Sequence, residues 1–181
     1  MRTLFNVLGP LTNPARVTRQ VLGVYDAALC EPLARALQLL GSTHALVLHS
    51  EDGLDEISVA SPTHGVELKS GGLVPLSIEP SHYGRRFESL DGLQVETADA
   101  SAALIQSAFA GDQDGASCKA RAIIALNAGA GIYVSGGADD LAGGIARAGE
   151  ALSSGAAAEK LAEFVCFTQT LSAQPEGVPQ V

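Results

Sequence analysis

The chain has 181 residues, 46% of them hydrophobic, and is therefore long and apolar enough to form one globular core of ordinary size. Its formal net charge of −9 argues against non-specific nucleic-acid binding, which requires clustered Lys and Arg. The sequence offers no uncharged apolar window of about 18 residues and no signal-peptide pattern at its start, so we expect neither a membrane span nor a secretory leader.

The cysteines and histidines are scattered along the chain. Cys30, Cys118 and Cys166 form no C-x-x-C pair and no disulfide framework, which predicts reduced thiols in a cytoplasmic protein. His44 and His49 are five residues apart on a predicted strand, so their side chains point to opposite faces. We therefore interpret the histidines as hydrogen-bonded structural residues and not as a metal pair.

The first regular elements form a strand–helix–strand unit. Residues 19–25 and 44–49 are short, β-branched or apolar runs that predict strands. The segment between them predicts a helix that Asp26 caps, that has Pro32 in its first turn and that Gly41 terminates. Such a unit implies parallel pairing of the two strands.

Four carboxylates lie within six positions directly after the second strand. The stretch "HSEDGLDEIS" contains Glu51, Asp52, Asp55 and Glu56. A solvated turn and a metal site have the same composition, so the local pattern leaves both interpretations open.

Short β-type segments follow this loop, and helices follow them. We expect strands at 56–61, 64–70 and 73–80, and a long polar loop at 80–96. Helices are predicted near residues 99–110, 116–135, 139–153 and 156–170, with Gly111, Gly136 and Gly155 as stops.

The segment "CKARAIIALNAGAGIYVSGG" is rich in Ala and Gly although it lies in a predicted helix. Glycine inside a helix costs about 1 kcal/mol relative to Ala, so a packing reason is expected. A phosphate-binding loop is the alternative, but the segment matches neither G-x-G-x-x-G nor G-x-x-x-x-G-K-[ST]. We favour close approach of another element.

Three ordered motifs resemble one enzyme family. The string "RTLFNVLGPLTNPA" at residues 2–15 is similar to the pattern R-T-[IL]-F-N-x-L-G-P-[LM]-x-N-P of the anthranilate phosphoribosyltransferases. The string "GLDEIS" at residues 53–58 follows at the family's spacing, and "ALNAGAGIYVSG" with "AGEALSSGAA" resembles the family's C-terminal helices. The resemblance covers nearly the whole chain.

The resemblance implies transfer of a phosphoribosyl group from phosphoribosyl pyrophosphate to the amine of anthranilate, an early step of tryptophan biosynthesis. It implies an α/β fold with a mostly parallel sheet flanked by helices, as in the large domain of the nucleoside phosphorylase and phosphoribosyltransferase type. It further implies Mg²⁺ as cofactor, a cytoplasmic location, and a full-length homodimer formed through an N-terminal helical domain.

Part of the family's pattern is absent from this sequence. The G-T-G-G-D pyrophosphate loop, the N-x-S-T segment and the K-H-G-N-R segment lie upstream of R-T-x-F-N in the family. We therefore expect residues 1–171 to be the C-terminal portion of the α/β domain and residues 172–181 a disordered tail. The chain alone is then expected to be inactive. The alternative is a non-catalytic fragment or pseudoenzyme that binds a partner.

The resemblance implies a role in metal binding for the acidic loop. In the family the D-E pair holds Mg²⁺ with the pyrophosphate substrate, which makes Asp55 and Glu56 the expected metal ligands. A loop lets neighbouring carboxylates converge, and Gly53 permits the turn. Glu51 and Asp52 match no motif and are expected to face water. No catalytic residue is assigned in this chain.

The same resemblance implies substrate contacts near the N-terminus. Gly9 and Pro10 correspond to the family's aromatic-substrate channel, and the alternative is a rigid turn without ligand contact. Asn6 and Asn13 are expected to hold backbone groups of that turn.

Overall fold

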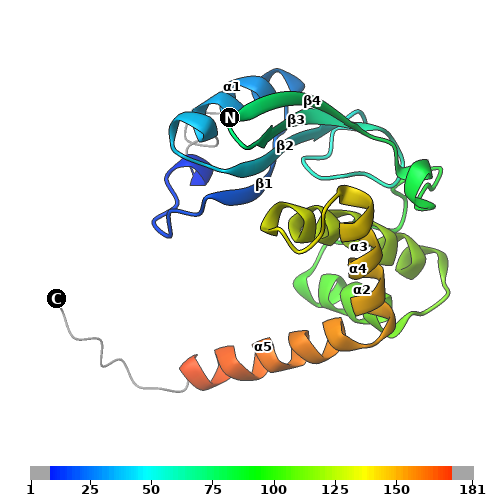
Figure 1. Cartoon of the computed structure of the whole chain (residues 1–181). Helices are drawn as coiled ribbons and strands as arrows, with labels where there is room; N and C mark the ends of the chain where they lie inside the picture. The colour runs from blue at the N-terminus through cyan, green and yellow to red at the C-terminus, as the bar shows by residue number, and fades with distance from the viewer. Residues whose placement is uncertain (1–8, 173–181) are drawn as a thin grey trace.

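A four-stranded sheet in the order β1-β2-β3-β4 organises residues 9–172, the part of the chain that the computed structural model describes (Figure 1). Its strands are β1 Arg19–Gly23, β2 His44–Ser50, β3 Thr63–Lys69 and β4 Gly72–Ile78. β1 and β2 pair in parallel, whereas β2 with β3 and β3 with β4 pair antiparallel.

The α/β class is thus confirmed, but the sheet is mixed where a mostly parallel one was expected. The reason lies in the connections. Ser70 and Gly71 alone join β3 to β4, both with positive φ (51° and 79°), and so short a turn forces an antiparallel hairpin. No helix intervenes between β2 and β3 either.

The predicted strand–helix–strand unit is confirmed. A short 3-10 turn, η3 (Ala27–Leu29), leads into helix α1 (Cys30–Leu39). The Asp26 carboxylate accepts a hydrogen bond from the Ala28 N–H at 3.0 Å, Pro32 lies in the first turn of α1, and Gly41 follows the helix with φ of +89°. Helix α1 covers one face of the sheet.

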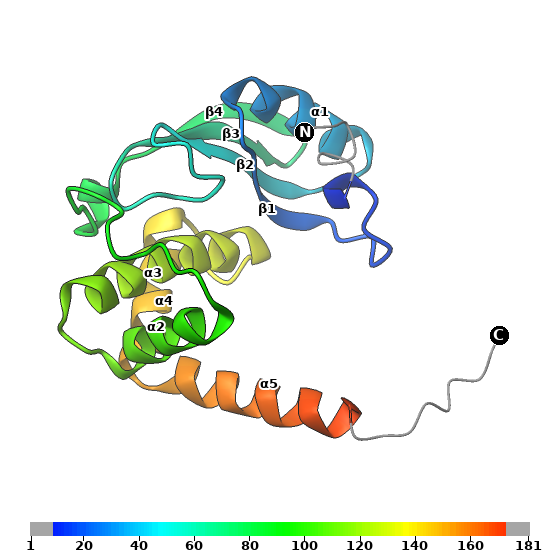
Figure 2. The same cartoon turned by 180° about the vertical axis from the view of Figure 1, so that it is seen from behind.

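The helices of the second half lie on the other face (Figures 1 and 2). They are α2 Ala98–Ala110, α3 Gly115–Ser135, α4 Leu141–Ser153 and α5 Ala156–Ser172. Each agrees with its prediction within two residues. Gly111 and Gly136 are left-handed C-caps, and Gly155 separates α4 from α5 with φ of +84°.

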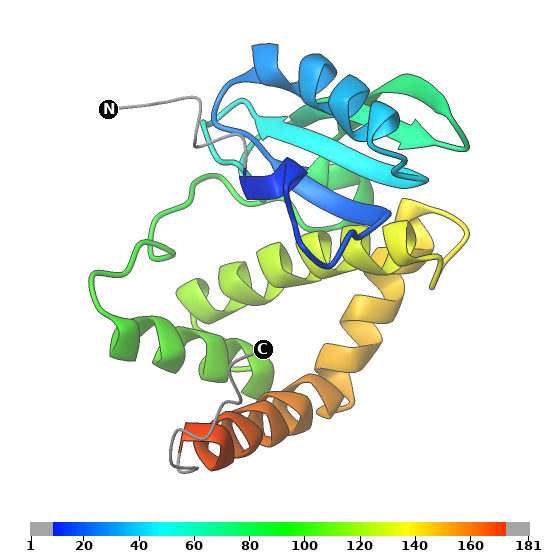
Figure 3. The ribbon, with the colours of Figure 1, turned by 90° about the vertical axis from the view of Figure 1, so that its left-hand side faces the viewer.

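Helix α3 lies next to the sheet, and α5 runs along the far side of the helical layer (Figure 3). A core cluster that includes Leu46 and Leu48 of β2 and Leu126 of α3 fills the space between sheet and helices. On the opposite face, Ala45 and Val47 of β2 contact α1. The period of two along β2 therefore distributes its side chains to two cores.

The small residues of α3 serve close packing, as expected. A Cβ added to Gly129 would lie 2.5 Å from the Cα of Ile145 in α4, and one added to Gly144 would lie 2.2 Å from the carbonyl oxygen of Gly129. The backbones of α3 and α4 touch at these two glycines, which explains why glycine is present inside both helices.

The strand predicted at 56–61 is wrong, because this segment consists of bends and irregular backbone. Its apolar alternation reflects burial: Ile57 and Val59 are fully buried in the core. Its backbone is satisfied by side chains and by the Phe87 N–H, which donates to the Val59 carbonyl at 2.8 Å, and not by a neighbouring strand. The Ser58 N–H, for example, donates to the hydroxyl of Thr63 at 3.1 Å.

The long loop predicted at 80–96 is confirmed apart from one 3-10 turn, η4 (Pro80–Tyr83). Of the tail predicted for 172–181, Ser172 ends α5 and residues 173–181 lie outside the described part of the chain. None of the helices within residues 9–172 combines the length and the apolar character that a membrane crossing needs.

Candidate functional site: an acidic loop at the end of β2

The acidic loop connects β2 to β3 and begins where the parallel strand β2 ends. The side chains of Asp55 and Glu56 are exposed, whereas the next residue, Ile57, is fully buried. The loop thus presents two adjacent carboxylates to solvent from a backbone that is anchored in the core. The carboxyl edge of parallel strands is where α/β proteins commonly bind ligands.

Hydrogen bonds across the base of the loop fix its shape. The hydroxyl of Ser58 donates to the Asp52 carboxylate at 2.5 Å, and the Leu54 N–H donates to the same side chain at 3.4 Å. The hydroxyls of Ser50 and Ser61 lie 2.8 Å apart. Burial raises the pKa of Asp52, but hydrogen bonding, first from Ser58, outweighs burial and leaves that pKa below its ordinary value.

Glu51 and Asp52 are exposed, as expected, but they are not merely solvated. Glu51 forms an exposed pair with His64, with 2.8 Å between Oε1 and Nε2. Asp52 closes the loop through Ser58. Both therefore have structural partners, which leaves Asp55 and Glu56 as the carboxylates available to a ligand.

Two contacts from distant elements meet the backbone next to these carboxylates. Asn127 of α3 forms hydrogen bonds with both the N–H and the C=O of Ile57, each at 2.9 Å. Gly23, the last residue of β1, lies so close to Asp55 that an added Cβ would be 1.5 Å from the Asp55 carbonyl oxygen. Sequence reasoning missed both residues; the one available signal was a polar Asn127 in an otherwise apolar helix segment.

A cavity of about 320 Å³ adjoins Asp55 and Glu56. Its other walls are mainly apolar and come from the long loop, α2 and α3; they include Leu90, Leu93, Leu104 and Ile123. Partial burial of the Glu56 carboxyl, and then the negative charge of Asp55, raise the pKa of Glu56 above its ordinary value. The site therefore combines a water-poor wall with two carboxylates whose charges repel each other.

The donor set fits a hard cation that needs few protein ligands. Within residues 9–172 no cluster of three or more His, Cys, Asp or Glu side chains is arranged to hold a metal ion. Mg²⁺ is commonly bound by one or two carboxylates and completes its coordination with water and substrate phosphates. Asp55 and Glu56 match that requirement, whereas a structural zinc site would need four ligands.

The predicted substrate residues lie elsewhere. Pro10 belongs to the 3-10 turn η2 (Gly9–Leu11) and lines a separate cavity of about 350 Å³ near the start of β1 and the end of α1. Among the described residues, none lies within 4 Å of a Cβ added to Gly9. The structure does not bring these residues together with Asp55 and Glu56.

The turn around Asn13 is held as expected, since the Asn13 side chain accepts a hydrogen bond from the Ala15 N–H at 2.9 Å. Asn6, with the start of the R-T-x-F-N motif, lies outside the described residues.

The histidines of β2 have structural roles, as predicted. Nε2 of the buried His44 lies 2.9 Å from Glu67, which also accepts a hydrogen bond from the Tyr133 hydroxyl at 2.6 Å. His49 Nδ1 lies 2.8 Å from the carbonyl oxygen of Val24, on the opposite face of the sheet. The first group connects β2 and β3 to α3, and the second connects β2 to the residue that follows β1. All three cysteines are free.

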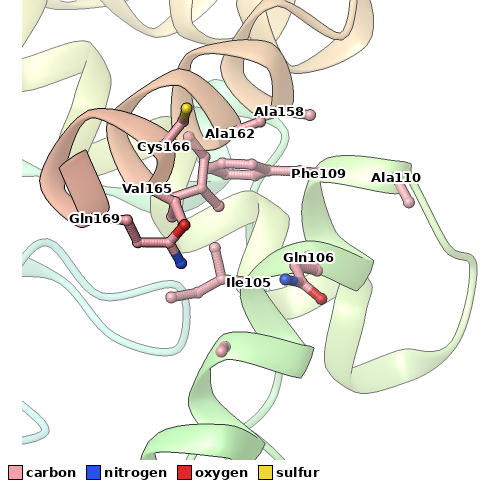
Figure 4. A pocket seen from close by; sticks show the side chains of 11 residues that line it. Ile105, Gln106, Phe109, Ala110, Ala158, Ala162, Val165, Cys166 and Gln169 are labelled. Carbon is pink, nitrogen blue, oxygen red and sulfur yellow. The ribbon is translucent and has the colours of Figure 1, made fainter. Parts of the chain in front are cut away.

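A further cavity of about 630 Å³ lies between α2 and α5 (Figure 4). Ile105 and Phe109 of α2 face Val165 and Cys166 of α5 across it, and no charged residue lines it. Apart from Gln106, Gln169 and the Cys166 thiol, the described side chains that line it are apolar, so we do not assign chemistry to it.

Comparisons with known proteins identify the family. The sequence pattern of a glycosyl transferase family, a/b domain, matches residues 1–158. Anthranilate phosphoribosyltransferases of Saccharophagus degradans and Teredinibacter turnerae are 54% and 53% identical over 168 residues, which is 93% of this chain and 49% of theirs. The chain thus spans about half the length of the curated relatives it matches.

Solved structures share the fold. The crystal structure of anthranilate phosphoribosyltransferase from Thermus thermophilus superposes with a TM-score of 0.81 at 36% identity, covering 93% of this chain and 49% of that one. The Saccharomyces cerevisiae enzyme in complex with PRPP and Mg has a TM-score of 0.78 at 27% identity, covering 94% and 48%. Because residues 1–158 match its a/b domain and the fold is α/β, the chain belongs to the glycosyl transferase family.

Proposed function

We propose that this chain is the C-terminal portion of an anthranilate phosphoribosyltransferase and that Asp55 and Glu56 hold the Mg²⁺ of its phosphoribosyl pyrophosphate substrate. One observation carries the proposal. An exposed carboxylate pair lies on a fixed loop at the end of a parallel strand, in a chain that is 54% identical to such an enzyme over 168 residues.

In the proposed reaction the bond between ribose C1 and the pyrophosphate oxygen breaks, and pyrophosphate leaves with the electron pair. A bond forms between C1 and the amine nitrogen of anthranilate, which then loses a proton. Bound Mg²⁺ supplies Lewis-acid stabilisation of the negative charge that develops on the leaving group. Asp55 and Glu56 orient that group, because their own backbone is fixed to the core.

The proposal extends to the assembly and the location of the enzyme. Residues 1–181 contain no G-T-G-G-D loop, so we propose that the chain is inactive without a segment that supplies it. By resemblance, the complete enzyme is a cytoplasmic homodimer that forms through its N-terminal helical domain, with anthranilate contacts at Gly9 and Pro10. A chain that only binds a partner is the competing function, and its half-length match to relatives favours that alternative for the isolated chain.

A chimera tests the proposal. The N-terminal half of the Saccharophagus degradans relative is joined ahead of this chain, and anthranilate consumption is followed by loss of its fluorescence at limiting Mg²⁺. We expect turnover by the chimera, none by the 181-residue chain, and at least a 100-fold loss of turnover in Asp55→Asn with Glu56→Gln.

Glu51→Gln in the same chimera is the matched control, because Glu51 lies on the same loop but pairs with His64. It should retain turnover. Full turnover of the double variant at limiting Mg²⁺ contradicts the metal assignment. Turnover by the isolated chain contradicts its proposed inactivity, and an inactive chimera favours the partner-binding alternative.

A further inference from the structure

The side-chain amide of Asn127 pairs with the backbone of Ile57 as a neighbouring strand would. Its Oδ1 accepts from the Ile57 N–H at 2.9 Å, and its Nδ2 donates to the Ile57 carbonyl at 2.9 Å and to the Ile123 carbonyl at 3.0 Å. Ile57 offers one donor and one acceptor, so these partners determine the orientation of the amide. Because Ile57 is fully buried, loss of the amide would leave two backbone groups without partners.

A second contact holds the other side of the carboxylate pair. The Asp55 carbonyl oxygen occupies the space that a side chain on Gly23 would need, at 1.5 Å from the ideal Cβ position. Gly23 has no positive φ, so its glycine is required for space and not for conformation. Strand β1 thus contacts the backbone of Asp55, while α3 contacts that of Ile57, and Glu56 lies between them.

We infer that Asn127 and Gly23 are positioning residues that set the directions of the Asp55 and Glu56 carboxylates. This inference rests on the proposed metal role of that pair. Mg²⁺ demands near-ideal octahedral geometry, and a binding constellation must be held within about 0.5 Å of its productive arrangement. On a loop, small backbone rotations displace a carboxylate by more than that, so fixation has to come from contacts beside the pair.

The Asn127–Ile57 contact and its effect on metal binding are measured separately on the 181-residue chain. Hydrogen–deuterium exchange of the Ile57 amide reports the contact. Electron paramagnetic resonance of free Mn²⁺, compared with a protein-free solution that contains the same inorganic pyrophosphate, reports metal binding by the chain. The variants are Asn127→Leu, which keeps the size and improves the helix propensity of that position, and Gly23→Ala, which acts from the other side of the loop.

The matched control for stability is Leu152→Ala. Leu152 of α4 is buried in a separate cluster with Ala148 of the same helix and Ala125 of α3. All binding measurements are made well below each variant's melting temperature. We expect Asn127→Leu and Gly23→Ala to weaken Mn²⁺ binding about 10-fold or more, in the range seen when supporting partners of metal ligands are removed. Leu152→Ala should lower the melting temperature and leave Mn²⁺ binding unchanged.

Each outcome decides a different part of the inference. Faster Ile57 exchange with unchanged Mn²⁺ affinity in Asn127→Leu overturns the positioning role while the metal site stands. An equal loss of affinity in Leu152→Ala also overturns it, since the effect then follows stability alone. Absence of Mn²⁺ binding in the wild-type chain overturns the metal assignment itself. If Gly23→Ala does not fold, Asn127→Leu alone carries the decision.

Discussion

The contact between α3 and α4 makes Gly144→Ala a destabilising substitution, although alanine is the better helix former. The new Cβ would lie 2.2 Å from the Gly129 carbonyl oxygen, 3.1 Å from its carbonyl carbon and 3.2 Å from the Tyr133 nitrogen. All three are backbone atoms. Rotation of a side chain cannot remove this clash. To reach an ordinary contact distance of 3.4 Å, the two helices must move apart by more than an ångström.

The magnitude follows from two opposing effects. Overpacking of a well-packed core costs about 1–3 kcal/mol and occasionally more, and the shared backbone contact places this case at or above the upper end. The gain in helix propensity offsets about 1 kcal/mol. We expect a net loss of about 2 kcal/mol in the free energy of unfolding, or about 4–8 °C in melting temperature for a chain of this size.

Urea unfolding followed by circular dichroism measures this loss. Gly131→Ala is the control, because Gly131 lies two residues from Gly129 in α3 but is exposed, and no described residue outside its own helix turn is within 4 Å of its added Cβ. That variant should gain about 0.5–1 kcal/mol. A Gly144→Ala chain as stable as the wild type would refute the argument that backbone contact explains these glycines.

Two further predictions concern titratable groups. The pKa of Asp52 is held below its ordinary value, so its carboxylate stabilises the fold above about pH 4 and loses that effect as the pH falls through the lowered pKa. Asp52→Asn should therefore lose stability relative to wild type at pH 7 and converge with it in urea unfolding as the pH falls below the lowered pKa of Asp52; a pH-independent difference would contradict this. Burial, and then the charge of Asp26, raise the pKa of the Cys30 thiol. In native protein at pH 8 a thiol reagent should modify the exposed Cys166 and leave Cys30 intact until urea is added, as read by mass spectrometry; early labelling of Cys30 would show that α1 opens readily.

Local signals in the sequence predicted the elements well. Asp26 caps the turn before α1, and Gly111 and Gly136 terminate helices, because each acts on backbone groups within a few residues. The direction of β3 and β4 was not predicted, because the strand–helix–strand unit determines pairing only for β1 and β2. The turn at Ser70 and Gly71 was the feature that decided it.

The candidate site was predictable only in part. The acidic cluster and its resemblance to a family motif identified Asp55 and Glu56, and the structure places both on an exposed loop beside a cavity. The partners of that loop were not predictable. Asn127 is 70 residues away from Ile57 in the chain, and Gly23 at the end of a strand has the same appearance as any turn glycine. The false strand at 56–61 has the same origin, since the partners of its backbone are side chains and a loop N–H and not a neighbouring strand.

The long-range anchoring of the acidic loop has a consequence for the order of folding. Arg19 donates to the Val134 carbonyl at 2.7 Å near the end of α3, and Asn127 holds Ile57 from the middle of the same helix. Contacts of such sequence separation form late, because the intervening chain must first be closed into a loop. During synthesis the carboxylates of residues 55 and 56 emerge early, yet they acquire their arrangement only once α3 has emerged and docked. Under the proposed metal role of Asp55 and Glu56, cation binding would report that both halves of this chain have come together.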